Sequence, residues 1–404
     1  MKWEYKTLDQ LGTVSRGKSK HRPRNDPKLF GGKYPFIQTA DVKNADYYIT
    51  KYSDTYNESG LAQSKLWDKG TLCITIAANI ADTGVLAFPA CFPDSIMGFV
   101  PFEGVANTRF IKYCFDRLQR DCKQISQGTA QDNLSWEKLS TIKFCIPEYK
   151  EQCRIADILS AYDDLIENNQ KQIKLLEEAA QRLYKEWFVD LRFPGHENTK
   201  IVDGVPEGWS KSTVSEVSAV LRRGISPKYN EKARGIVINQ KCIRQTIVSY
   251  DEARTQEKKY PAELEMMESD IVICSTGAGT LGRVGQIFEA KGNATLDSHV
   301  TLIRANEKIG QQSLFWSLKM KQDYLMSAGK GSTNQLELSR ETIGNCKILV
   351  PEWKMAGQAE KNFAAIHDKM KECSMKITRL REARNLLLPK LMSGERSEER
   401  RVGK

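Results

Sequence analysis

Residues Ile155–Trp187 read IADILSAYDDLIENNQKQIKLLEEAAQRLYKEW. Apolar side chains recur in this stretch at alternating steps of four and three residues. Because an average spacing of about 3.5 residues keeps one apolar stripe facing a partner helix, this pattern is typical of a coiled coil. The predicted seam of this helix comprises Ile155, Leu159, Tyr162, Ile166, Ile173, Leu176, Leu183 and Trp187.

The same register returns near the end of the chain, so we expect the two helices to pair antiparallel. In that arrangement the first seam position of one helix faces the last of the other, and Ile155 would meet Leu391. The alternative is that each stripe packs only on its own globular domain. The length of the stripe, about 50 Å at 1.5 Å per residue, argues against it. The second seam comprises Phe363, Ile366, Met370, Ile377, Leu380, Leu387 and Leu391.

Two residues of the second helix interrupt its pattern. Arg384 falls on the seam, where we expect it to face the ring of Tyr162, because an aromatic ring attracts a cation. Pro389 lacks the N–H that a helix interior needs, so the helix is expected to kink or stop near Leu388. The following residues 394–404 are nearly all polar and are expected to be disordered.

The chain also repeats itself once, which fixes its architecture before any motif is considered. With one inserted residue, Trp3–Gly17 aligns with Trp209–Gly224. Further along, Ile37–Val42 aligns with Ile238–Ile243, and in each half a strand that ends in Pro-Glu precedes the long helix. Short apolar runs predict strands near residues 70–77, 84–88, 270–275, 284–288 and 298–303.

The fold class expected from these patterns is α+β. Two tandem-repeated mixed α/β domains are separated by two long helices that form an antiparallel coiled coil. The expected bounds are 1–150 for the first domain, 151–190 for the first helix, 191–352 for a linker and the second domain, 353–393 for the second helix, and 394–404 for the tail.

Composition narrows the class of protein. The chain has 404 residues, with 61 Lys and Arg against 51 Asp and Glu, a net charge of +10. The positive charge suits a polyanionic partner. The composition, with 40% apolar and 28% charged residues, excludes collagen, mucin and bulk disorder. No apolar run approaches the roughly 18 residues that cross a bilayer, so we expect a cytoplasmic protein without membrane contact. The ten cysteines form no CxxC pair and there are four histidines, so no metal site is expected.

One motif suggests a cofactor, but its context does not. Gly277–Gly282 matches G-x-G-x-x-G, the dinucleotide-binding fingerprint. The next residues, 283–288, alternate like a strand, whereas the fingerprint requires a helix. We therefore interpret the motif as a strand-turn-strand connection. No phosphate-binding lysine loop, H-E-x-x-H or G-x-S-x-G element occurs either, so we expect neither a cofactor nor catalysis in this chain.

A binding surface remains as the candidate site. A basic loop near residue 20 and its counterpart in the second half have the charge to hold phosphates, although a merely solvated loop is the alternative. Segments rich in amides and hydroxyls carry the groups that read base edges, although such segments also cap helices. The candidates are Arg16, Lys18, Lys20, Arg22, Arg24, Gln38, Thr39, Gln127, Thr129, Gln131, Asn133, Arg222, Arg223, Lys228, Tyr229, Asn239, Gln240, Lys330, Ser332, Thr333, Asn334 and Gln335.

Three further segments carry a family resemblance. Residues 183–196 read LYKEWFVDLRFPGH, residues 205–209 read VPEGW and residues 387–395 read LLPKLMSGE. With these segments the chain resembles the specificity subunit of type I restriction-modification systems. The resemblance covers residues 1 to 395. Beyond Glu395 such chains usually continue with a short apolar segment, whereas this one continues with RSEERR.

The resemblance implies two target recognition domains, each reading one half of a split sequence in double-stranded DNA, with the helix pair as a ruler between them. It implies two methylation subunits that dock on the helices and bind S-adenosylmethionine, and restriction subunits in the full complex. The chain itself would be a non-catalytic, sequence-specific DNA-binding subunit. The alternatives are a coiled-coil scaffold or adaptor without DNA specificity, and a nucleotide-dependent enzyme that uses Gly277–Gly282.

Overall fold

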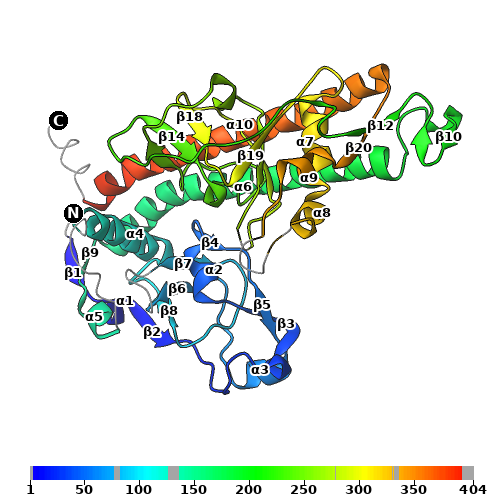
Figure 1. The fold of residues 1–404 in the computed structure, drawn as a ribbon. Helices are drawn as coiled ribbons and strands as arrows, with labels where there is room; N and C mark the ends of the chain where they lie inside the picture. Colours follow the sequence, from blue (N-terminus) through cyan, green and yellow to red (C-terminus); the bar gives the residue numbers. More distant parts are fainter. Residues whose placement is uncertain are drawn as a thin grey trace. The chain divides into compact units, whose positions relative to one another are not determined.

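The structure is a computed structural model that describes residues 3–76, 82–125, 136–277, 279–329, 331 and 336–393. The chain divides into two compact units. The first unit holds Met1–Asn168 and Ile377–Lys404, and the second holds Asn169–Lys376. Each long helix, α6 (Tyr149–Tyr184) and α10 (Trp353–Met392), contributes one end to each unit (Figure 1).

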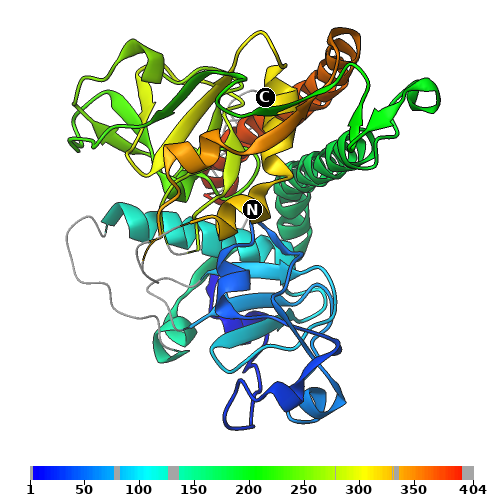
Figure 2. The same cartoon turned by 45° about the vertical axis from the view of Figure 1, so that its right-hand side comes forward.

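The first unit is built on a five-stranded sheet with the order β2-β8-β6-β7-β4. Every side chain of β6 and β7 is buried, as expected for strands covered on both faces. In Figure 2 the strands of this unit, coloured from blue to cyan, run side by side. The strands are β2 (Gly12–Arg16), β4 (Tyr48–Ile49), β6 (Leu72–Thr75), β7 (Thr83–Leu86) and β8 (Ile96–Pro101).

Smaller elements surround this sheet. Two antiparallel pairs form, β1 with β9 and β3 with β5, and the amphipathic helix α4 packs against the sheet through Phe110 and Phe115. The remaining elements are β1 (Glu4–Lys6), α1 (Leu8–Leu11), η1 (Pro27–Leu29), β3 (Phe30–Phe36), α2 (Thr39–Lys43), β5 (Asp54–Tyr56), α3 (Glu58–Ala62), α4 (Thr108–Ile125), α5 (Trp136–Thr141) and β9 (Phe144–Ile146).

The second unit contains a four-stranded sheet with the order β13-β19-β16-β17 and a three-stranded sheet with the order β15-β14-β18. The strands are β12 (Ser210–Thr213), β13 (Ser218–Arg223), β14 (Gly235–Ile238), β15 (Arg254–Gln256), β16 (Ile271–Cys274), β17 (Val284–Gln286), β18 (Ala294–Leu296), β19 (Val300–Ala305) and β20 (Lys347–Val350). The helices are η4 (Gln240–Cys242), η5 (Ala262–Leu264), α7 (Gln311–Lys319), α8 (Gln322–Ser327) and α9 (Arg340–Gly344).

The two sheets confirm the internal repeat. The order β2-β8-β6-β7 of the first unit corresponds to β13-β19-β16-β17 of the second, and β1 with β9 corresponds to β12 with β20. The aligned glycines Gly17 and Gly224 occupy equivalent places: each donates its N–H to the first residue of the neighbouring strand, at 2.9 and 3.0 Å. A Cβ at either position would collide with backbone carbonyl oxygens, so only glycine fits.

The long helices pair antiparallel, as predicted. In the first unit Ile155 and Leu159, near the start of α6, share a core with Leu388 and Leu391, at the end of α10. In the second unit the end of α6 shares a core with Phe363, near the start of α10. All predicted seam residues are buried or half-buried.

Arg384 corrects one register prediction. Its guanidinium donates to the carboxylate of Asp163 and not to the ring of Tyr162. Asp163 is 2% exposed and also accepts a hydrogen bond from the Tyr113 hydroxyl, at 2.5 Å. Arg384 therefore pairs with the buried carboxylate of Asp163, the residue that follows Tyr162 on the facing helix.

Pro389 does not end the second helix near Leu388, so the predicted stop is wrong. Helix α10 continues to Met392, and Ser393 donates its N–H to the carbonyl oxygen of Pro389 at 3.0 Å. Leu388, Leu391 and Met392 are buried in the core of the first unit, and this burial offsets the hydrogen bond that proline cannot donate. The tail expected at residues 394–404 lies outside the described residues.

The segment expected to be a linker is also more ordered than predicted. After the π-helical turn η2 (Lys185–Val189) and the short η3 (His196–Asn198), strands β10 (Ile201–Val202) and β11 (Val205–Pro206) form a hairpin. Phe193 and Trp209, which flank it, are buried in the core of the second unit with ring centroids 4.7 Å apart. Their contact fixes both ends of the segment.

The glycine motif forms a hairpin, as predicted. Strands β16 and β17 pair antiparallel, and Gly282 donates its N–H to the carbonyl oxygen of Cys274 at 2.8 Å. Gly277, Gly279 and Gly282 all have positive φ, which explains three glycines in one turn. Within the described part of the chain, no helix is long and apolar enough to cross a membrane.

Candidate nucleic-acid interface

The basic loop of the first unit follows β2 and is held in place by its own unit. The carbonyl oxygen of Lys18 accepts a hydrogen bond from the Ser64 hydroxyl at 2.7 Å. The backbone N–H of His21 donates to the side-chain oxygen of Gln63 at 3.0 Å. A loop anchored in this way presents its side chains at lower entropic cost than a freely moving one.

The five cations of this loop are all exposed but differ in their partners. Arg24 pairs with Asp94 at 2.7 Å, and Arg22 donates to two backbone carbonyl oxygens. Arg16, Lys18 and Lys20 have no carboxylate partner among the described residues. Together with Arg22, whose partners are neutral carbonyl oxygens, these three carry the uncompensated positive charge of the loop.

The polar turn of the first unit lies at the start of α2. Gln38 is its N-cap, and its side-chain amide donates to Asp54 at 2.5 Å while its backbone N–H donates to Asp41 at 2.8 Å. Thr39 is the first residue of the helix and is half-buried. The Gln38 side chain is exposed, but its amide already donates a hydrogen bond to Asp54. A contact of this amide with DNA would have to replace that hydrogen bond.

The cations of the second unit are arranged differently from those of the first. Arg222 and Arg223 are consecutive on β13, so their side chains point to opposite faces. Arg222 pairs with Glu263, whereas Arg223 pairs with Glu337 and donates to the carbonyl oxygen of Ser275 at 3.5 Å. The two arginines therefore do not form one patch.

Lys228 and Tyr229 are exposed and also have partners within the unit. Lys228 pairs with Glu257. The Arg254 guanidinium lies 3.5 Å from the centroid of the Tyr229 ring, a cation–π contact. Sequence reasoning missed Arg254, because an isolated arginine near a strand gives no signal; the structure adds its exposed charge to Tyr229.

Asn239 is buried and hydrogen-bonded within its own unit, and its contact with a base stays a prediction. It is 8% exposed, its amide donates to the carbonyl oxygen of Glu252 at 2.7 Å, and its side-chain oxygen accepts from the N–H of Lys241 at 2.8 Å. It caps η4, the structural alternative for such a turn. The next residue, Gln240, is half-buried and accepts from the Thr280 hydroxyl at 3.1 Å.

The two segments rich in amides and hydroxyls lie outside the described residues. They contain the remaining candidates Gln127, Thr129, Gln131, Asn133, Lys330, Ser332, Thr333, Asn334 and Gln335.

Most cysteines among the described residues are buried. In the part of the chain that the structure describes, no group of three or more His, Cys, Asp or Glu side chains could hold a metal ion. Burial raises the pKa of the Cys73 and Cys114 thiols, and that of Cys274 to about 12, so these thiols are protonated and unreactive at neutral pH.

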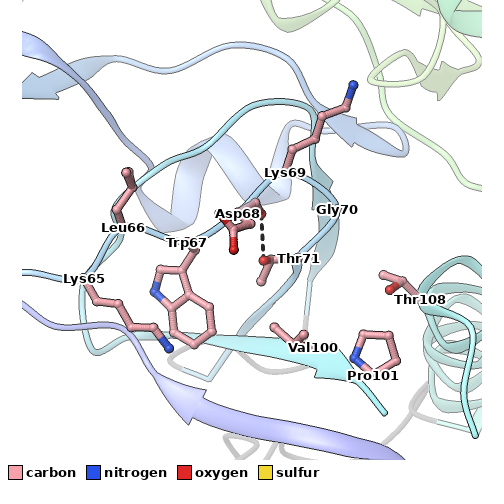
Figure 3. A pocket seen from close by; sticks show the side chains of 10 residues that line it. All are labelled: Lys65, Leu66, Trp67, Asp68, Lys69, Gly70, Thr71, Val100, Pro101 and Thr108. Carbon is pink, nitrogen blue, oxygen red and sulfur yellow. Dashed lines mark hydrogen bonds between the residues drawn. The ribbon is translucent and has the colours of Figure 1, made fainter. Parts of the chain in front are cut away.

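A cavity of about 330 Å³ opens on the first unit (Figure 3). The ammonium of Lys65 lies 3.5 Å from the centroid of the Trp67 ring, and the Thr71 hydroxyl donates to the carbonyl oxygen of Asp68 at 2.7 Å. The ten residues that line it include neither a histidine nor a cysteine.

The sequence of this chain is similar to those of known proteins. Residues 1–178 match the model of the type I restriction modification DNA specificity domain. The type I restriction enzyme MjaIX specificity subunit of Methanocaldococcus jannaschii is 26% identical over 412 residues, covering 97% of this chain and 93% of that protein. The HindI specificity subunit of Haemophilus influenzae is 25% identical over 335 residues, covering 65% of this chain and 71% of that protein.

The fold agrees with these matches. The crystal structure of the S subunit of a type I restriction-modification system from M. genitalium superimposes with a TM-score of 0.56 at 18% identity, covering 97% of this chain and 96% of that one. These matches identify residues 1–178 as a type I restriction modification DNA specificity domain, and they show that the chain is similar over nearly its whole length to specificity subunits of type I restriction enzymes.

Proposed function

We propose that this chain binds double-stranded DNA sequence-specifically, with each unit reading one half of a bipartite target. The observation that carries the proposal is the duplicated strand end, where Arg16-Gly17 and Arg223-Gly224 occupy equivalent places in two units that share a strand order but differ in their surface residues. Two units with the same strand order but different surface residues suit the recognition of two half-sites that differ in sequence. The helix pair would set the distance between them.

The first unit would grip the DNA backbone through its basic loop. Arg16, Lys18 and Lys20 are exposed and carry no carboxylate partner among the described residues. Neutralising phosphates with such cations releases condensed counterions, which supplies sequence-independent affinity. In the second unit the described candidates Arg222, Arg223 and Lys228 are paired with carboxylates, so this unit would contribute less of the sequence-independent affinity and more of the discrimination between sequences.

The long helices would carry the methylation subunits. Leu175 on α6 and Leu386 on α10 are 64% and 72% exposed, and exposed leucines on long helices suit a protein partner. In this proposal two methylation subunits dock on the helices and bind S-adenosylmethionine, restriction subunits join the full complex, and this chain has no cofactor and performs no catalysis. We place the complex in the cytoplasm, with access to the chromosome.

The test is co-expression with a methylation subunit, followed by single-molecule sequencing of the host genome for N6-methyladenine. We expect methylation at one split motif whose two halves flank an unspecific spacer. A complex that forms, retains its S-adenosylmethionine and methylates no split motif would contradict the proposal. Omission of this chain is the control, because the methylation subunit alone should leave the motif unmodified.

A further inference from the structure

One exposed histidine of the second unit is held unusually firmly. His299 lies in the turn between β18 and β19. Its N–H donates to the side-chain oxygen of Asp297 at 2.9 Å, and its carbonyl oxygen accepts from the N–H of Ser275 at 2.8 Å. Its ring Nδ1 is hydrogen-bonded to the Thr276 hydroxyl at 2.7 Å. Two hydrogen bonds therefore hold the backbone of His299 and a third orients its ring, although the residue is exposed.

The surroundings of this ring contain two of the predicted DNA contacts. Arg223 donates to the carbonyl oxygen of Ser275, the same residue whose N–H binds His299. Gln240 is bonded to Thr280, whose hydroxyl also donates to the carbonyl oxygen of Thr276 at 3.0 Å. The imidazole thus lies in one connected polar group with an arginine and an amide, side chains that hydrogen-bond the phosphates or base edges of DNA.

The internal repeat identifies the counterpart of this residue in the first unit. Ser95 immediately precedes β8, as His299 precedes β19, and its carbonyl oxygen accepts from the N–H of Ile76 at 3.1 Å, as that of His299 does from Ser275. The preceding residue, Asp94, pairs with Arg24 of the basic loop. The same turn therefore adjoins a predicted DNA-binding arginine in both units.

Comparing the two turns separates what the units share from what differs. Both place Arg-Gly at the end of the adjacent strand, at Arg16-Gly17 and Arg223-Gly224. They differ at the turn itself, which presents serine in one unit and histidine in the other. A shared residue suits the phosphate backbone, which is the same at every half-site, whereas a differing residue suits the bases.

We propose that His299 is a specificity-determining residue that hydrogen-bonds a base edge in the half-site of the second unit, and that Ser95 occupies the corresponding place in the first. This inference rests on the proposed function. With Nδ1 bound to Thr276, the ring presents a single hydrogen-bonding position, Nε2. A reader fixed by its own unit discriminates better than a mobile one, because little freedom is lost on binding.

The experiment compares variants of the chain in complex with the methylation subunit, scoring N6-methyladenine at every genomic copy of the motif and at sites with one mismatch. For His299→Ala we expect the ratio of methylation at matched to mismatched sites to fall about tenfold at one base pair of one half-site. The other half-site should keep its discrimination. Ser95→Ala should relax the opposite half.

Thr276→Val gives a second, milder test, because it leaves the imidazole in place and removes only the hydroxyl that orients it. We expect a smaller relaxation at the same base pair as for His299→Ala. His196→Ala, in the segment between α6 and β10, is the matched control and should leave the motif unchanged. Thermal unfolding of each complex checks that the variants are folded.

The outcomes separate the two levels of the account. If the wild-type complex methylates a split motif, and folded His299→Ala and Thr276→Val complexes keep the wild-type discrimination at every base pair, the role of His299 is overturned while the proposed function stands. If the wild-type complex methylates no split motif, the proposed function falls and this inference falls with it.

Discussion

At the scale of single residues, the charge of the basic loop makes the clearest prediction. Lys18 and Lys20 are exposed without carboxylate partners among the described residues. Replacing either with alanine should weaken binding to all DNA sequences alike and reduce the slope of log K against log salt by about one. Fluorescence anisotropy with duplex DNA at several salt concentrations measures this. An unchanged slope in both variants would remove the loop from the interface.

Buried His367 predicts a pH dependence of stability. It is 4% exposed, its Nε2 has no partner, and burial lowers its pKa despite the nearby carboxylates of Asp368 and Glu268, while Lys371 adds to the lowering. The unfolded chain takes up a proton as the pH falls through about 6.5, whereas the folded chain does not. The contribution that the neutral His367 makes to the free energy of unfolding is therefore fully present above this pH and decreases as the pH falls below it.

We expect this loss to reach up to about 1.4 kcal/mol per pH unit between the two pKa values. The measurement compares urea unfolding at pH 7.5 and 5.5 for the wild-type chain and for His367→Leu, which removes the titrating group and keeps an apolar contact with Phe288. The variant should lose less stability on acidification. Equal losses in the two proteins would show that His367 is protonated when folded.

The pairing of Asp163 with Arg384 predicts a large destabilisation. Asp163→Ala leaves the guanidinium of Arg384, which is 19% exposed, without its carboxylate. Breaking a buried pair from one side costs about 3 to 5 kcal/mol. Asp163→Leu combined with Arg384→Met should recover much of that loss. Urea denaturation followed by circular dichroism tests both, and a single variant as stable as the double one would contradict the account.

At the scale of elements, the helix seam predicts which leucines stabilise the pair. Leu159 is fully buried between the sheet and the end of α10, whereas Leu175 on the same helix is 64% exposed. Leu159→Ala should therefore lower the free energy of unfolding by about 2 to 5 kcal/mol. The matched variant Leu175→Ala should change it by less than about 0.5 kcal/mol. Similar losses in both would disprove the predicted register.

The elements that follow from local pattern were predictable from the sequence. The heptad spacing from Ile155 to Trp187 and the apolar runs at β6 and β16 are contained in neighbouring residues. The continuation of α10 past Pro389 was not predictable, because it depends on burial against a core assembled from distant segments. The contact of Phe193 with Trp209 is of the same kind.

The candidate site also has one part that the sequence predicts and another part that only the fold shows. The clustered cations of residues 16–24 are visible in the sequence, but the carboxylates that pair with Arg222, Arg223 and Lys228 are distant in the chain. Only the fold shows that these charges are compensated. His299 gave no signal as a lone histidine, and its anchoring and its counterpart Ser95 became recognisable only when the two units were compared.

At the scale of the whole molecule, the central claim is that two structurally equivalent units read two independent half-sites. The most direct test replaces residues 1–150 with the corresponding segment of another specificity subunit and maps N6-methyladenine in cells that also express the methylation subunit. Helix α6 begins at Tyr149, so the exchange leaves the second unit and nearly all of both long helices unchanged.

The account predicts a new motif in which one half has changed, while the other half and the spacer between them keep the parental sequence and length. A chimeric complex that still methylates DNA, but with both halves altered or with neither altered, would show that the two units do not read separate half-sites.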